Sequence, residues 1–253
     1  ADTRDDTREV NMIVLSVLAL AVGLATGIGA VIFRSTLVGL HTFFFFGELS
    51  LTPTSGATGP VSPLGALIIL VPVIGGVAVV WITRRFAPEA KGGGITDVMD
   101  AVYHREGKLR PRVAIVKTIA SALSIGSGAT VGREGPRGQI GSAIGSAVAQ
   151  FSRLPSWQRI TLLAAGASAG ISATFNTPLG AVLFALELIL PEVSARTFLP
   201  VVISTGSATN IGRAVFGSYL AYVLPQMSFA ASEMDHTFNP GALPALGLSL
   251  IHT

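Results

Sequence analysis

The chain of 253 residues lacks cysteine altogether, which excludes disulfide bonds, thiolate metal sites and cysteine nucleophiles. Charge is also scarce, because Asp, Glu, Lys and Arg make up only 12% of the residues and the net charge is +3. The basic side chains are spread among connecting segments instead of forming one face, which argues against nucleic acid as a partner. The four histidines lack the spacing of metal ligands, and the sequence contains no recognisable cofactor loop or pairing of nucleophile and base. We therefore expect no metal site, no cofactor and no enzyme.

Apolar residues are abundant: they make up half of the chain, and the mean hydropathy is +0.64. This composition is typical of an integral membrane protein. The 29 glycines and 14 prolines fit helices that pack closely or are interrupted. Helical segments are expected at residues 12–33 with a continuation to 46, and at 66–83, 95–103, 113–125, 139–151, 161–190 and 198–216.

The distribution of Lys and Arg predicts the topology. Residues 84–112 hold the densest group of basic residues, so they are expected to face the cytoplasm. The chain thus divides into a cytoplasmic segment at 1–11, a membrane region at 12–216, an extracellular linker at 217–240 and the start of a truncated further helix at 241–253. We expect a multi-pass protein of the cell membrane with a cytoplasmic N-terminus.

Residues 126–141 place an acidic side chain in the middle of this apolar chain, with Glu134 between two glycines. A carboxylate at membrane depth is costly, so it is retained where it has a partner, a cavity or an ion path. The glycines interrupt a helix, and Pro136 suits the first turn of the next one. Glu134 is therefore the first functional candidate; the alternative is a structural ion pair with Arg133 or Arg137.

A second helix start is expected at residues 95–103, an element too short to span a membrane that three glycines, 92–94, precede. Asp97 lies in its first turn, where a carboxylate suits the positive end of the helix dipole. Helix N-termini offer free backbone N–H groups, and transporters aim such ends at anions. The sequence therefore predicts an anion site between this N-terminus and the one at Gly135 and Pro136. The alternative for 92–94 is a flexible turn before a cytoplasmic amphipathic helix.

Two more charges and one more break lie in apolar stretches. Lys117 is expected to snorkel or to find a partner, and Glu187 to reach a cytoplasmic partner. Residues 161–190 are interrupted around Asn176 and Pro178, which predicts a cap and a break between two helices. The small residues at 164–173 predict close helix packing and not a phosphate cradle, because no Walker lysine follows them.

Three motifs follow one another along the chain. They are Ala87-Pro88-Glu89-Ala90 with Gly92-Gly93-Gly94-Ile95; Gly132-Arg133-Glu134-Gly135-Pro136 with Gln139-Ile140-Gly141; and Ala164-Ala165-Gly166 through Phe175-Asn176-Thr177-Pro178-Leu179 to Leu183-Phe184-Ala185-Leu186-Glu187. Together they resemble the CLC family of chloride channels and chloride/proton exchangers. The resemblance implies an all-α membrane protein of polytopic helices with broken and re-entrant half-helices. It covers the first of the family's two inverted repeats, and it implies a homodimer in the lipid bilayer.

The same resemblance implies roles for particular residues. Glu134 would be the gating glutamate, which competes with an anion for one site and in exchangers also carries the proton. The anion-binding residues would be Gly93, Gly94, Ile95, Arg133, Gly135 and Pro136. The family usually has Ser at Gly93 and Pro at Thr96, so the hydroxyl contact to a central anion is missing. The inner proton-transfer glutamate is replaced by Leu188, which leaves Glu187 as the remaining proton-pathway candidate.

We therefore expect transmembrane transport of chloride or a similar small anion, gated by Glu134, with proton exchange left open. One alternative is a passive anion channel without proton coupling, which Leu188 favours. Another is a non-transporting scaffold or half-protein that needs a second repeat, because only one repeat is present.

Overall fold

The computed structural model describes residues 9–47, 65–86, 94–129, 131–132, 134–192 and 194–216, which all belong to one unit, residues 1–218. Within these ranges every regular element is a helix. The elements are α1 (Met12–Phe46), the 3-10 helix η1 (Gly65–Ile69), α2 (Leu70–Phe86), α3 (Gly94–His104), α4 (Pro111–Gly126), α5 (Glu134–Phe151), α6 (Ser156–Phe175), α7 (Pro178–Leu188) and α8 (Ala195–Phe216). The predicted linker and final element, at 217–253, lie outside the described residues.

The predicted break between two helices near Glu134 is confirmed, but the second helix begins earlier in the chain than the predicted segment. Helix α4 ends at Gly126, and α5 begins at Glu134, five residues before the predicted start at 139. The predicted segment 139–151 was therefore too short at its start, whereas the prediction that Pro136 lies in the first turn of this helix is confirmed. Glu134 is thus the first residue of α5.

The break between α6 and α7 is also where the sequence places it. Asn176 adopts a left-handed backbone, with φ of 55°, and its N–H donates to the Ser172 carbonyl at the end of α6. Asparagine tolerates this conformation better than most residues. Thr177 occupies the N-cap of α7 without a side-chain cap bond, and Pro178 begins the helix. The break is confirmed, with Asn176 as the capping residue.

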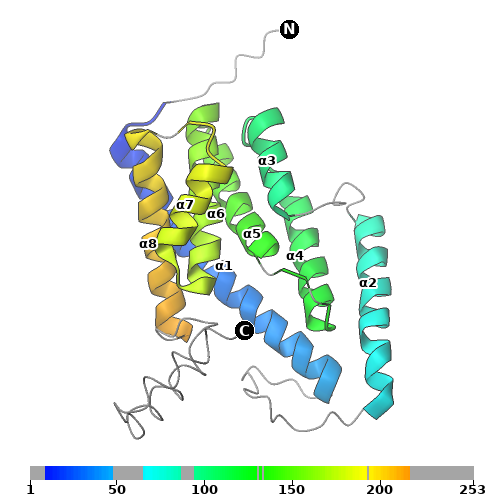
Figure 1. Cartoon of the computed structure of the whole chain (residues 1–253). Helices are drawn as coiled ribbons and strands as arrows, with labels where there is room; N and C mark the ends of the chain where they lie inside the picture. The colour runs from blue at the N-terminus through cyan, green and yellow to red at the C-terminus, as the bar shows by residue number, and fades with distance from the viewer. Residues whose placement is uncertain are drawn as a thin grey trace, which may run out of the picture. The chain divides into compact units, whose positions relative to one another are not determined.

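Helix α6 is the centre of the unit and is buried along nearly its whole length. It packs against α1, α5, α7 and α8 (Figure 1). The backbones of α5 and α6 touch where Gly141 faces Gly166, because a Cβ on either glycine would overlap the backbone of the other. Close helix packing through small residues is therefore confirmed for residues 164–173.

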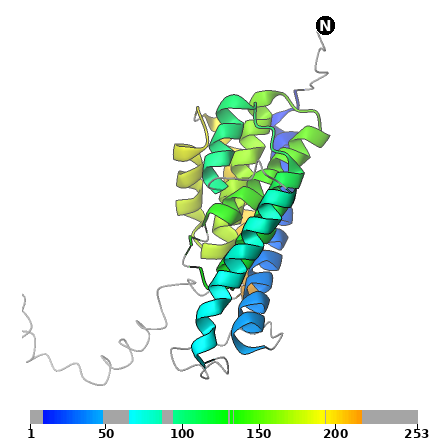
Figure 2. The same cartoon turned by 90° about the vertical axis from the view of Figure 1, so that its right-hand side faces the viewer.

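Small polar side chains are buried together with apolar ones, and many large apolar side chains are exposed. Buried positions include many hydroxyl residues: Thr26, Ser142, Ser146, Ser168, Ser172, Thr205 and Thr209. Large apolar side chains point outward, as on α1 and on α2, which lies in front in Figure 2; Ile13 is 79% exposed and Val77 is 67% exposed. In the described residues α1 alone is long and apolar enough to cross a membrane by itself. Small polar residues inside and apolar residues outside are typical of helices packed in lipid.

Candidate anion site

The N-termini of α3 and α5 lie against each other. A Cβ built on Gly94, the first residue of α3, would be 2.6 Å from the carbonyl oxygen of Gly135 in α5. Only glycine at position 94 allows this approach without displacing one backbone. The first N–H groups of a helix have no intrahelical partner and carry partial positive charge. The structure therefore brings together the two N-termini that the sequence predicted.

A cavity of about 360 Å³ opens at this meeting point. Gly94, Gly135 and Pro136 contribute to its wall from the two helix starts. The other lining residues come from α2, α4, α5 and the segment before α5: Val79, Thr83, Lys117, Ala120, Ser121, Ser124, Ile125, Val131, Gly132 and Gln139. Backbone N–H groups, hydroxyl groups and an ammonium group at one cavity are suited to a small anion.

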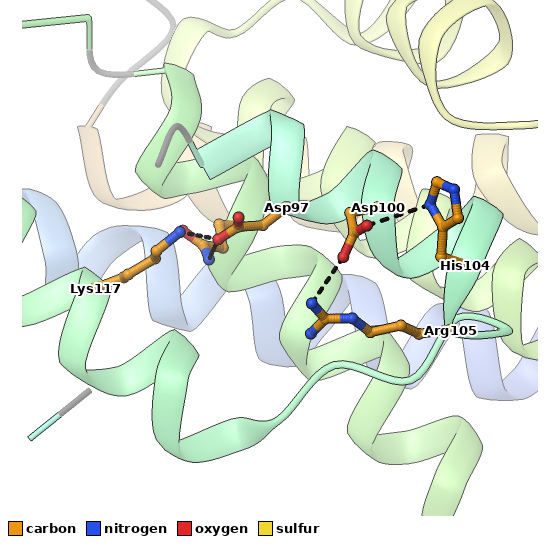
Figure 3. A network of polar contacts seen from close by, with 6 residues as sticks. Asp97, Asp100, His104, Arg105 and Lys117 are labelled. Carbon is orange, nitrogen blue, oxygen red and sulfur yellow. Dashed lines mark hydrogen bonds and ion pairs between the residues drawn. The ribbon is translucent and has the colours of Figure 1, made fainter. Parts of the chain in front are cut away.

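Lys117 brings positive charge to this cavity from the middle of α4. Its side chain is buried, and its ammonium group forms an ion pair with Asp97 of α3 (Figure 3). The Gln139 side chain donates to the same Asp97 carboxylate at 3.4 Å. The Asp97 carboxylate is half-buried, and a charge removed from water is tolerated when it is paired and hydrogen-bonded. Of the two arrangements expected for Lys117, snorkelling or a partner, the structure shows a partner, Asp97.

The next turn of α3 carries a second, more exposed charge cluster. Asp100 pairs with Arg105 at 2.8 Å and with the His104 ring at 3.2 Å (Figure 3). A small cavity of about 50 Å³, lined by Asp97, Asp100 and Arg105 among others, lies between this cluster and the Lys117 pair. Polar groups therefore continue along α3 from the anion-site cavity to the predicted cytoplasmic end.

Glu134 starts α5 with an exposed side chain that bends back along the chain. A Cβ built on Gly132 would be 2.6 Å from its Oε2 atom, so the carboxylate lies directly over that glycine. Gly132 lines the anion-site cavity. A carboxylate at the first residue of a helix is stabilised by the helix dipole. The Glu134 carboxylate thus lies over a residue of the cavity wall, Gly132, while its own side chain is exposed.

The other residues predicted for the site lie outside the cavity wall or outside the described residues. The Ile95 side chain packs on Gly138 of α5, so Ile95 locks α3 against α5. Glu187 is exposed on α7, which packs on α6 and α8, whereas the helices that line the cavity are α2, α3, α4 and α5. The structure therefore does not bring Glu187 to the anion-site cavity. Gly93 and Arg133 lie outside the described residues.

Sequence reasoning missed the polar group that Asp97 forms with Lys117 and Gln139. It treated Asp97 only as a helix-dipole residue and Gln139 only as part of a motif. The available signal was that Lys117 is an isolated charge in an apolar segment, where a charge requires a partner. Asp97, in the short helix that precedes this segment, was one candidate for that partner.

The family model and the relatives that match this chain all describe chloride channels or chloride transporters. Residues 75–249 match the family model described as voltage gated chloride channel. The chain is 33% identical over 212 residues to the H(+)/Cl(-) exchange transporter ClcA of Vibrio campbellii, covering 78% of this chain and 45% of the relative. It is 32% identical over 246 residues to the ClcA transporter of Vibrio vulnificus, covering 94% of this chain and 48% of the relative. The chain thus spans about half the length of these relatives.

Solved structures show the same fold. A slow cyanobacterial Cl-/H+ antiporter superposes with a TM-score of 0.68 at 27% identity, covering 86% of this chain and 50% of that chain. A CLC-type fluoride/proton antiporter superposes with a TM-score of 0.64 at 22% identity, covering 82% of this chain and 49% of that chain. The second likeness concerns the fold alone. The prediction of an all-α CLC-like membrane fold is confirmed.

Proposed function

This chain belongs to the voltage gated chloride channel family, and we propose that it supplies part of a transmembrane pathway for chloride or a similar small anion. The observation that carries the proposal is the contact of the α3 and α5 N-termini, through Gly94 and Gly135, at a cavity that Lys117 also lines. The named relatives are transporters, so the family assignment is to transport and not to an enzyme.

The anion would be bound mainly by backbone. The first N–H groups of α3 belong to Gly94 and Ile95, and those of α5 to Glu134 and Gly135, while Pro136 has none to give. Dehydrating a small anion requires groups that replace its water, as filter carbonyls do for cations. The ammonium of Lys117 adds a positive field that Asp97 offsets in part. We include Gly93 and Arg133 in this site on the family resemblance.

Glu134 would act as the gate. Its carboxylate lies over Gly132 at the edge of the cavity, at the same helix N-terminus that would hold the anion. A carboxylate and a chloride ion compete for one positive end, because both are stabilised by the same N–H groups. The anion would pass when the Glu134 side chain swings away, and protonation of that side chain would favour the open arrangement.

Proton exchange would make Glu134 a proton carrier as well, with Glu187 as its inner partner. The named ClcA relatives exchange protons for chloride. A passive anion channel is the second candidate, because Leu188 occupies the inner proton-transfer position and Glu187 lies on a helix away from the cavity. The coverage of about half of each relative is the reason to expect that a second repeat completes the pathway.

The remaining features of the proposal concern the setting of the chain. It would be a multi-pass protein of the cell membrane with its N-terminus in the cytoplasm, because the basic segment 84–112 marks that side. It would work as a homodimer, transport chloride without a cofactor and bind no nucleic acid.

Replacing Glu134 with Gln in the full-length protein tests the gate. We expect chloride flux from liposomes to lose its pH dependence and any coupled proton flux to stop, because the amide cannot carry a proton between the two sides. The matched control is Glu106→Gln, which changes a carboxylate in the loop between α3 and α4, where it pairs with Lys108. Flux through Glu134→Gln that keeps the pH dependence of the unmodified protein contradicts the assignment.

Reversal potential measured under opposed chloride and proton gradients separates the two candidates. A proton-coupled exchanger shifts its reversal potential with the proton gradient, whereas a passive channel follows the chloride gradient alone.

A further inference from the structure

Two cavities of opposite character meet at Pro111, the first residue of α4. One, here called the basic cleft, has a volume of about 810 Å³, and Lys108, Arg110 and Pro111 are among its lining residues. The other, here called the apolar groove, has a volume of about 480 Å³ and runs from Pro111 between α1, α4 and α5. We propose that the basic cleft and the apolar groove together bind one anionic phospholipid, with an acyl chain in the groove and the phosphate in the cleft.

The apolar groove offers a ligand nothing but hydrocarbon. Its walls are Ile, Ala, Phe, Pro and Gly side chains, with Thr36 and Thr118 as the two polar residues. The Thr36 hydroxyl donates to the Ile32 carbonyl at 2.9 Å, and the Thr118 hydroxyl donates to the Ala114 carbonyl at 2.8 Å. Both hydroxyls are thus already used by their own helices. An occupant of the groove gains from apolar contact alone.

The length of the groove matches one leaflet of a bilayer. It extends along α4 from Pro111 to Ala122, which at about 1.5 Å per residue is about 16 Å. Half of a hydrocarbon core of about 30 Å is about 15 Å. A chain that enters at Pro111 therefore reaches the bilayer centre at Ala122. This length favours an acyl chain over a compact apolar ligand.

The basic cleft has the charge that an anionic headgroup requires. Arg105, Lys108 and Arg110 line it, and Arg112 follows them in the sequence. Asp100 pairs with Arg105, and Glu106 with Lys108. Arg105 is held by Asp100 at 2.8 Å, whereas Lys108 and Glu106 are 3.7 Å apart and both exposed. Exposed pairs of this kind contribute little stability.

The basic cleft also lies where a phospholipid headgroup would be, at the start of α4. Pro111 and Arg112 begin α4 directly after the basic loop, and apolar residues 113–116 follow, so the proposal places the membrane surface at this level. Anionic lipids attract basic residues next to a membrane helix. A phosphate in the cleft and an acyl chain in the groove are therefore joined at the level where a phospholipid joins them.

The first test removes two positive charges from the basic cleft. Delipidated protein is incubated with vesicles of phosphatidylcholine alone or mixed with phosphatidylglycerol, and the lipid retained after purification is counted by native mass spectrometry. We expect K108Q combined with R110Q to lower the preference for phosphatidylglycerol by about fivefold per removed cation and by more than the control does, because direct contact with the phosphate adds to the general attraction of basic residues to the membrane surface. The matched control is R84Q combined with R85Q, at the end of α2, which removes the same charge elsewhere. An equal loss in the control would show diffuse surface charge and overturn the proposal.

The second test fills the groove. Ala147 is exposed and lines the groove, so A147F should lower retention of both lipids several-fold while keeping the preference between them. The control V77F adds the same bulk to the exposed face of α2. If A147F does not fold, I115N serves instead, because it places an amide in the groove.

Three further outcomes overturn the proposal. Unchanged lipid retention by A147F would show that no acyl chain occupies the groove. A lower unfolding temperature of A147F with unchanged phosphatidylglycerol retention would assign the groove to a protein segment. Full displacement of phosphatidylglycerol by inorganic phosphate would show that the cleft binds anions without the acyl chain. None of these outcomes bears on the role proposed for Glu134.

Discussion

Replacing Gly94 with Ala tests whether the α3 and α5 N-termini meet as the structure shows. The new Cβ would lie 2.6 Å from the Gly135 oxygen, about 0.8 Å short of the 3.4 Å at which ordinary contact begins. The two helix starts must therefore separate by about 0.8 Å or strain their backbones. Overpacking of this kind costs about 1–3 kcal/mol of stability.

The same displacement allows an estimate of the effect on anion binding. A helix N-terminus acts as about half a positive charge. At about 3.5 Å and an effective dielectric constant of about 20, it attracts a monovalent anion by about 2.4 kcal/mol, and at about 4.3 Å by about 1.9 kcal/mol. The difference of about 0.5 kcal/mol corresponds to about a twofold weaker affinity. Gly94→Ala should therefore lose more stability than affinity.

Thermal unfolding and calorimetric titration with chloride measure the two quantities on the same protein. The matched control is Gly76→Ala in α2, where a Cβ would meet no atom within 4 Å. That control should keep or gain stability, because alanine restricts the unfolded chain. The reasoning is refuted if Gly94→Ala unfolds at the same temperature as Gly76→Ala and binds chloride with unchanged affinity.

Two further predictions concern polar groups within the helix packing. Asp97→Asn should destabilise the protein by about 1–3 kcal/mol, because it removes the carboxylate that pairs with the buried Lys117 ammonium. The double replacement Asp97→Leu with Lys117→Met should recover most of that loss in chemical unfolding. The hydroxyls of Ser168 and Thr205, 2.6 Å apart between α6 and α8, should show a coupling of about 0.6 kcal/mol in a double-mutant cycle of alanine variants. Additive single effects at this second pair would contradict the hydrogen bond.

Several elements of the fold could be predicted from local sequence. The break before Glu134, the break at Asn176 and the short helix after the three glycines depend on backbone preferences of Gly, Pro and Asn, which act within a few residues. The segment predicted at 139–151 began five residues too late, although the local preference of Pro136 for a first turn had already placed an N-terminus at Gly135 and Pro136.

The sequence by itself determined that this is a membrane protein of interrupted helices with an isolated carboxylate at Glu134, because composition and helix breakers are local properties. The tertiary structure alone decided that Gly94 touches Gly135, that Asp97 pairs with Lys117, and that Glu187 stays away from the cavity. These relations join residues up to tens of positions apart, and they depend on how closely helices cross. Helix crossing in turn depends on which small residues face one another, and no single helix contains that information.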